Sequence, residues 1–199
     1  MSNIFQMKIM LRESAPPIWR RFLVKDNLTF HKLHEILQVV MGWTNSHLYD
    51  FQIKEQRITF PLQDWDEKVI NSKKVKINTL QEKQKFDYTY DFGDCWEHTI
   101  VVEKILYGQT GLPPPICLKG SLSCPPEDCG GIGGYYHLLQ IKNNKSHPEY
   151  KERGEWLGKD FNPELFDHNV INKELMERFI DRRARFWVPP SESHQNAKR

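Results

Sequence analysis

Two short segments hold most of the residues that could do chemistry in this chain. One reads YTYDFGDCWEH from residue 88 to residue 98, and the other reads CPPEDCGG from residue 124 to residue 131. Carboxylates together with a histidine serve general acid–base catalysis, and they also bind divalent metal ions that keep an open coordination position. The candidate catalytic or metal-binding residues are Asp91, His98, Glu127 and Asp128.

The first segment predicts a β-hairpin whose turn is centred on residues 93–94. A two-residue turn pairs Thr89 with His98 and makes Asp91 the diagonal neighbour of His98 on one face of the sheet. Such an aspartate orients an imidazole and raises its pKa. We also expect a positive φ at Gly93. The alternative interpretation is a hydrogen-bonded pair with a structural role only.

The cysteines suggest a second metal site. Cys117, Cys124 and Cys129 lie within thirteen residues, and with His98 they could bind zinc through three thiolates and one imidazole. Their spacing is wider than that of paired CxxC motifs, and cysteine is often a small buried apolar residue. A divalent metal such as zinc is therefore one of two open interpretations.

Aromatic residues flank the acidic ones and predict a pocket for a small ligand or a protein partner. The predicted pocket residues are Tyr88, Tyr90, Trp96 and Tyr135. The glycine-rich stretch 130–134 lacks the lysine and the serine or threonine of a phosphate-binding loop. We interpret it as a tight packing turn that leads into a helix.

Composition indicates an ordinary globular protein. The chain has 199 residues, of which 39% are hydrophobic and 27% charged, and its net charge is +2. No apolar stretch reaches the roughly 18 residues of a membrane span, and the N-terminus does not resemble a signal peptide, so we expect a cytoplasmic protein without a membrane partner. The net charge is too small to indicate a nucleic-acid surface. Arg12, Arg20 and Arg21 could still contact phosphates, which leaves nucleic acid open as a partner.

The hydrophobic pattern predicts an α+β fold with a mixed or antiparallel sheet. Strands at 5–11 and 18–24 precede a helix that Thr29 caps and Gly42 ends, and further strands follow as far as residue 106. This order is β-grasp-like. The last part is helical, with helices expected at 135–141, 147–156 and 172–185. We expect one domain over residues 1–187, with a β-rich part at 3–106 and the cysteine and glycine loop and helices at 107–187, followed by a flexible tail at 188–199.

Several of these motifs resemble one family. They are PPIWRR at 16–21, MGW at 41–43, the segment 88–98, the stretch 125–131 and the residues around 162–167. Over roughly residues 3–175 the chain resembles the plasmid pRiA4b ORF-3-like family. The resemblance implies an uncharacterised function, an association with plasmids and insertion sequences, and no known catalytic residues.

Three functional hypotheses follow from the sequence. The leading one is a non-enzymatic binding or interaction protein, associated with mobile genetic elements, whose aromatic and acidic pocket lies between Tyr88 and Tyr135. The first alternative is a metal-assisted hydrolase or nuclease-like enzyme. The second is a nucleic-acid-binding accessory protein.

Overall fold

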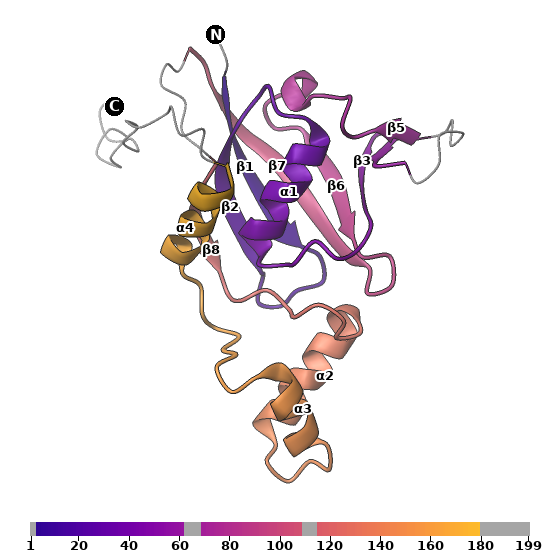
Figure 1. The fold of residues 1–199 in the computed structure, drawn as a ribbon, viewed down its shortest axis with the longest axis vertical. Helices are drawn as coiled ribbons and strands as arrows, with labels where there is room; N and C mark the ends of the chain where they lie inside the picture. Colours follow the sequence, from indigo (N-terminus) through magenta and orange to yellow (C-terminus); the bar gives the residue numbers. More distant parts are fainter. Residues whose placement is uncertain (1–2, 62–68, 109–114, 180–199) are drawn as a thin grey trace.

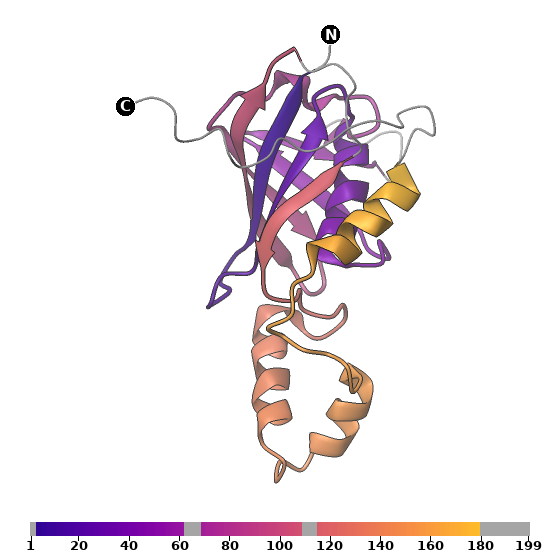
Figure 2. The same ribbon diagram turned by 90° about the vertical axis from the view of Figure 1, so that its left-hand side faces the viewer.

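The computed structural model describes residues 3–61, 69–108 and 115–179, and it confirms the α+β class. One eight-stranded sheet carries helix α1 across one face, and the remaining helices follow the last strand (Figures 1 and 2). The strand order is β5-β4-β3-β6-β7-β1-β2-β8, antiparallel throughout except for the parallel pair β4 and β5. The strands are β1 (Ile4–Leu11), β2 (Trp19–Lys25), β3 (Tyr49–Ile53), β4 (Gln56–Thr59), β5 (Val69–Asn71), β6 (Lys85–Tyr90), β7 (Trp96–Leu106) and β8 (Ile116–Ser121).

The helices of the described residues are α1 (Phe30–Met41), α2 (Gly131–Asn143), α3 (Tyr150–Leu157) and α4 (His168–Phe179), with a 3₁₀ turn η1 at Ile77–Thr79. Helix α1 begins and ends as the sequence predicts. The Thr29 hydroxyl accepts a hydrogen bond from the Lys32 amide at 3.2 Å, and Gly42 ends the helix with φ +91°.

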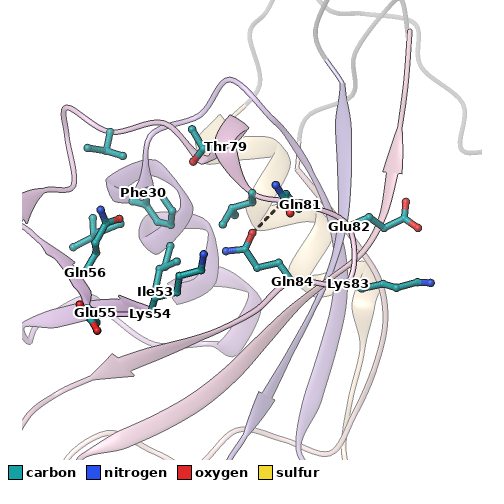
Figure 3. Close-up of a pocket in the computed structure, with 13 residues that line it drawn as sticks. Phe30, Ile53, Lys54, Glu55, Gln56, Thr79, Gln81, Glu82, Lys83 and Gln84 are labelled. Carbon is teal, nitrogen blue, oxygen red and sulfur yellow. Dashed lines mark hydrogen bonds between the residues drawn. The ribbon is translucent and has the colours of Figure 1, made fainter.

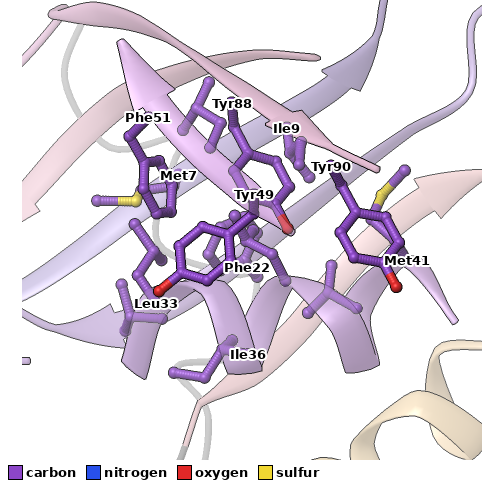
Figure 4. Close-up of a cluster of buried hydrophobic side chains, with 14 of the residues drawn as sticks. Met7, Ile9, Phe22, Leu33, Ile36, Met41, Tyr49, Phe51, Tyr88 and Tyr90 are labelled. Carbon is purple, nitrogen blue, oxygen red and sulfur yellow. The ribbon is translucent and has the colours of Figure 1, made fainter. Parts of the chain in front are cut away.

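The core lies between α1 and the sheet. Apolar side chains of β1, β2, β3, β6 and β7 alternate toward the helix, as expected of strands buried on one face. Figure 4 shows Phe51 and Tyr88 of the sheet beside Leu33 and Ile36 of α1. This layer is rich in aromatic rings, and the Phe51 and Tyr88 ring centroids are 4.8 Å apart.

The C-terminal helices form two groups. Helices α2 and α3 extend beyond one end of the sheet, whereas α4 returns beside β8 (Figures 1 and 2). Helix α3 buries none of its residues, while α4 buries Leu175. No helix of the described residues is long and apolar enough to cross a membrane.

The sequence misplaced several boundaries. It missed β5 and β8, and α2 begins four residues before the predicted start at Tyr135. The order strand, strand, helix, strands is present, but the finer β-grasp description is not confirmed by the topology. The division into one domain over residues 1–187 and a tail over 188–199 stays a prediction, and the tail lies outside the described residues.

Candidate metal centre

The hairpin between β6 and β7 has a different register from the predicted one. Tyr88 pairs with His98 and Thr89 with Glu97, so five residues, 91–95, form the loop. The predicted pairing of Thr89 with His98 was therefore wrong, and so was the positive φ at Gly93. Asp91 instead takes the left-handed conformation, with φ +55°, and its Oδ1 accepts the Gly93 amide at 2.9 Å.

The new register places His98 in the core. Its side chain is fully buried, its ring packs edge-on against Trp43, and its Nδ1 lies 3.2 Å from the Tyr88 carbonyl oxygen. Burial lowers the pKa of His98 to about 3, partly offset by hydrogen bonds to the backbone of Tyr88 and Trp96. A neutral imidazole in this position packs against aromatic rings and is not paired with Asp91.

The four predicted pocket aromatics are also core residues. Their exposed fractions are 0% for Tyr88 and Tyr90, 1% for Trp96 and 3% for Tyr135. Side chains buried to this extent offer no surface to a ligand. Tyr90 still contributes through its hydroxyl, which accepts the Ser46 amide at 3.0 Å.

The structure does not assemble the proposed zinc site of three cysteines and His98. Cys124 Sγ lies 3.9 Å from the sulfur of Met41, and Cys129 Sγ lies 3.8 Å from the Gly131 carbonyl oxygen. Burial raises the pKa of the Cys117 thiol to about 11 and that of Cys124 and Cys129 to about 12. Among the described residues these cysteines do not converge with His98 into a group of metal ligands.

A different set of side chains does converge. His47 Nε2 lies 3.7 Å from Asp91 Oδ2 and 3.3 Å from Asp128 Oδ1, and all three ligand atoms lie within 4.8 Å of one another. Two of the three residues, Asp91 and Asp128, were predicted from the sequence. His47 was missed, because it lies more than forty residues from either aspartate in the chain.

The geometry of this group fits one divalent ion. Metal–ligand bonds of roughly 2.0–2.2 Å at tetrahedral or octahedral angles place neighbouring ligand atoms about 2.8–3.6 Å apart. The two measured distances from His47 Nε2 are close to this range. The nitrogen is shielded from solvent and has no hydrogen-bond partner among the described residues, although both carboxylates are near. Both observations place His47 Nε2 where a ligand of a metal ion shared with the two carboxylates would stand.

The burial of Asp91 supports the same interpretation. Asp91 is 7% exposed, and a buried carboxylate requires hydrogen bonds, an opposite charge or a metal ion. Its Oδ1 is occupied by the Gly93 amide, which leaves Oδ2 directed toward His47. Hydrogen bonds of this kind orient metal-binding carboxylates.

Glu127 positions the site but is not one of its ligands. Its Oε1 accepts the Tyr90 hydroxyl at 2.5 Å, and its Oε2 accepts both the amide and the hydroxyl of Thr44. Burial and this carboxylate raise the pKa of Tyr90 well above its usual value. Glu127 thus joins the loop that carries Asp128 to the segment that carries His47.

The glycine-rich stretch has the packing role that the sequence indicated. The Gly130 amide donates to the Asp94 carboxylate, and a Cβ on Gly131 would lie 2.4 Å from the Asp94 carbonyl oxygen. Only glycine permits this approach, because Gly131 also has φ +67°. The contact holds the loop of Asp128 against the loop of Asp91.

A pocket of about 380 Å³ adjoins the three converging side chains. It is lined by Asn45, Ser46, His47, Leu48, Asp91, Phe92 and Gly93. Leu48 and Phe92 are each 44% exposed and form its apolar surface. A ligand in this pocket would therefore contact both an apolar wall and two of the three candidate metal ligands.

A larger cavity, of about 760 Å³, lies elsewhere, between the β3–β4 turn and residues 79–84 (Figure 3). Phe30, Ile58 and Leu80 form its apolar part, and Lys54 and Glu55 are among its polar residues. None of the predicted site residues lines it. The candidate site is therefore chosen by the converging side chains of His47, Asp91 and Asp128 and not by cavity size.

The arginines considered for phosphate binding have other partners. Arg12 pairs with Asp87, and Arg21 makes two hydrogen bonds to Glu103, at 2.6 and 2.8 Å. Arg20 is 2% exposed and donates to backbone carbonyl oxygens, among them that of Leu122 at 2.7 Å. These contacts give each of the three arginines a partner within the fold, while the side chains of Arg12 and Arg21 stay partly exposed. A nucleic-acid partner stays a prediction.

Three comparisons with known proteins found relatives of this chain. The model of the plasmid pRiA4b ORF-3-like proteins matches residues 3–170. The chain belongs to this family. It is 32% identical over 190 residues to the uncharacterized protein y4hQ of Sinorhizobium fredii, a match covering 94% of this chain and 95% of that protein. It also resembles the crystal structure of MM3350, a protein of unknown function from Methanosarcina mazei, with 34% identity and a TM-score of 0.78 over 85% of this chain and 97% of the other.

Proposed function

We propose that this pRiA4b ORF-3-like protein binds one divalent metal ion through His47, Asp91 and Asp128, and that the ion holds a small ligand in the adjoining pocket. The convergence of the three ligand atoms within 4.8 Å is the observation that carries the proposal. One imidazole and two carboxylates are side chains that bind metal ions in proteins. Ligand binding at a metal ion therefore accounts for more of the site than covalent catalysis does.

The ligand set indicates the kind of ion. One imidazole and two carboxylates suit first-row divalent ions such as Zn²⁺ and Mn²⁺, since imidazole favours Zn²⁺ and carboxylates favour Mn²⁺. Structural zinc sites in proteins are closed by four protein ligands, whereas three leave a position for water or a ligand. With three ligands among the described residues, the proposed site is of the open kind.

The pocket indicates the ligand. An open metal position binds an oxygen donor such as a carboxylate or phosphate group, and exposed Leu48 and Phe92 provide apolar contact for the remainder of the molecule. A small anionic compound with an apolar portion fits both features. The family description names a plasmid reading frame, which supports an association with mobile DNA but assigns no chemistry.

A second candidate function is metal-assisted hydrolysis. The open coordination position favours it, because a metal ion lowers the pKa of bound water and so supplies a hydroxide near neutral pH. Turnover of phosphate or carboxylate esters by the metal-loaded protein would select this function. Binding of the same compounds without turnover would select the first.

Titration calorimetry with Mn²⁺ and Zn²⁺ on tag-free protein tests the proposal. We expect one ion per chain in the wild type. His47→Gln and Asp91→Asn should each lower the affinity for the ion by more than about 100-fold, because loss of a hydrogen bond to a metal ligand typically lowers it roughly 10- to 100-fold. Asp94→Asn is the matched control. It removes a carboxylate from the same loop but keeps an oxygen for the Gly130 amide, so we expect wild-type affinity. Equal affinity in all four proteins would contradict the proposal.

A further inference from the structure

Four residues behind the metal site form a closed ring of hydrogen bonds. Gln38 Nε2 donates to the Tyr88 hydroxyl at 2.9 Å, and this hydroxyl lies 2.8 Å from His34 Nδ1. His34 Nε2 lies 2.6 Å from Asn45 Oδ1, and the Asn45 amide donates to Gln38 Oε1 at 3.0 Å. The side chains of Gln38, His34 and Tyr88 are at most 1% exposed, so water does not compete for these bonds.

Each hydrogen bond of this ring has a defined donor and acceptor. Asn45 Oδ1 can only accept, so His34 Nε2 carries the proton and Nδ1 accepts from the Tyr88 hydroxyl. Each residue then donates to the next around the ring. If the side-chain amide of Asn45 were rotated by half a turn, its nitrogen would donate to His34 Nε2, and His34 Nδ1 would become a second donor to the Tyr88 hydroxyl. The Tyr88 hydroxyl hydrogen would then have no acceptor among the described residues.

Asn45 connects the ring to the metal site. It has φ +63°, a conformation that asparagine tolerates better than most residues, and it lies two residues before His47. The ring holds Asn45 at both its amide and its side-chain oxygen. The next two amides, of Ser46 and His47, both donate to the Tyr90 hydroxyl. The direction in which the chain leaves the core is thus fixed by polar contacts.

We propose that this ring is the positioning device of the metal site: it holds Asn45 in the left-handed conformation and thereby sets where His47 stands relative to Asp91 and Asp128. The inference rests on the proposed function. Gln38, His34 and Tyr88 are positioning residues, since none of them is a ligand. A ligand already held in place loses little freedom when the ion binds, so the affinity for metal depends on the ring.

Tyr88→Phe is the sharpest variant. It removes one oxygen from the core and opens the ring at two bonds, those to Gln38 and His34. Tyr49→Phe is the matched control. Tyr49 is also buried, and its aromatic ring stacks on that of His34 with the centroids 3.5 Å apart. Its hydroxyl also has two partners, His31 and Ser72, but Tyr49 is not a member of the hydrogen-bonded ring.

The first measurement uses protein freed of metal, so that it depends only on the ring. Amide hydrogen exchange by NMR should be slow at Asn45 in the wild type and at least about tenfold faster in Tyr88→Phe, because the amide loses its ordered acceptor. Tyr49→Phe should keep the wild-type rate at Asn45. Unchanged exchange in Tyr88→Phe, or equal acceleration in both variants, overturns the inference whether or not the protein binds metal.

The second measurement is the affinity for Mn²⁺ in the same proteins. Tyr88→Phe should bind roughly 10- to 100-fold more weakly, as for other losses of an outer hydrogen bond, and Tyr49→Phe within about twofold of wild type. Equal affinity in the three proteins overturns the inference and leaves the metal site standing. A wild type that binds no Mn²⁺ overturns the proposed function and with it the role of the ring at a metal site.

Discussion

Two buried histidines should make the protein lose stability in mild acid. Burial lowers the pKa of both His34 and His98 to about 3, so both stay neutral in the folded protein at pH 5. In the unfolded chain they bind protons below about pH 6.5. The unfolded state therefore binds more protons between pH 6.5 and pH 3, and the free energy of unfolding falls as the pH falls through that window.

The size of the effect follows from the shifts. Each histidine lowers the free energy of unfolding by about 1.4 kcal/mol for each pH unit below 6.5, which amounts to roughly 2 kcal/mol between pH 7 and pH 5. The two together cost about 4 kcal/mol, a large part of the 5–15 kcal/mol that stabilises an ordinary domain. His31, whose pKa burial also lowers, adds to the loss in the same direction.

Urea unfolding at pH 7, 6 and 5 in EDTA measures this loss without any contribution from bound metal. His98→Leu removes one of the two titrating groups, so its loss between pH 7 and pH 5 should be about 2 kcal/mol smaller than that of the wild type. A wild-type free energy of unfolding that is constant over this range would refute the reasoning. A pH dependence unchanged by His98→Leu would refute the assignment to His98.

Two further variants test the packing that positions the site. Gly131→Ala should destabilise the protein by more than about 2 kcal/mol, because the new Cβ would meet the Asp94 carbonyl oxygen at a residue with positive φ. Gly133→Ala, which has open space around it, should be neutral or stabilising. Thermal unfolding that ranks the two variants the other way would contradict the packing described for Gly131. Arg20→Lys should lower the free energy of unfolding by about 2–4 kcal/mol, because four hydrogen bonds to carbonyl oxygens depend on its buried guanidinium. Arg21→Lys changes a partly exposed ion pair and should lower it by less than about 1 kcal/mol. Equal losses in urea unfolding would show that the burial of Arg20 does not decide the difference.

Local signals in the sequence predicted most of the fold. Alternating residues mark β1 and β2, and the cap at Thr29 with the glycine at position 42 marks α1, because each depends on neighbours within a turn or a strand. Strand β8 escaped prediction because Ile116–Ser121 has no clear alternation and is defined by its pairing with β2. Long-range pairing is not encoded in a local pattern.

The site was predicted in part for the same reason. Asp91 and Asp128 are acidic residues in glycine-containing loops, which is a pattern visible in the sequence. No such local pattern marks His47, and only the fold brings it close to the two aspartates. His98 was misplaced because a loop of five residues, closed by the bond between the Cys95 amide and the Asp91 carbonyl, changed the hairpin register. A shift of one residue moves a side chain to the opposite face of a sheet.

The anomalous scattering of Mn²⁺ in crystals of the protein tests the central claim most directly, because it locates the ion. We predict a single peak about 2.0–2.3 Å from His47 Nε2 and from one carboxylate oxygen each of Asp91 and Asp128, which disappears in crystals of Asp91→Asn. A well-occupied peak elsewhere, or no peak at these three residues at millimolar Mn²⁺, would contradict the account.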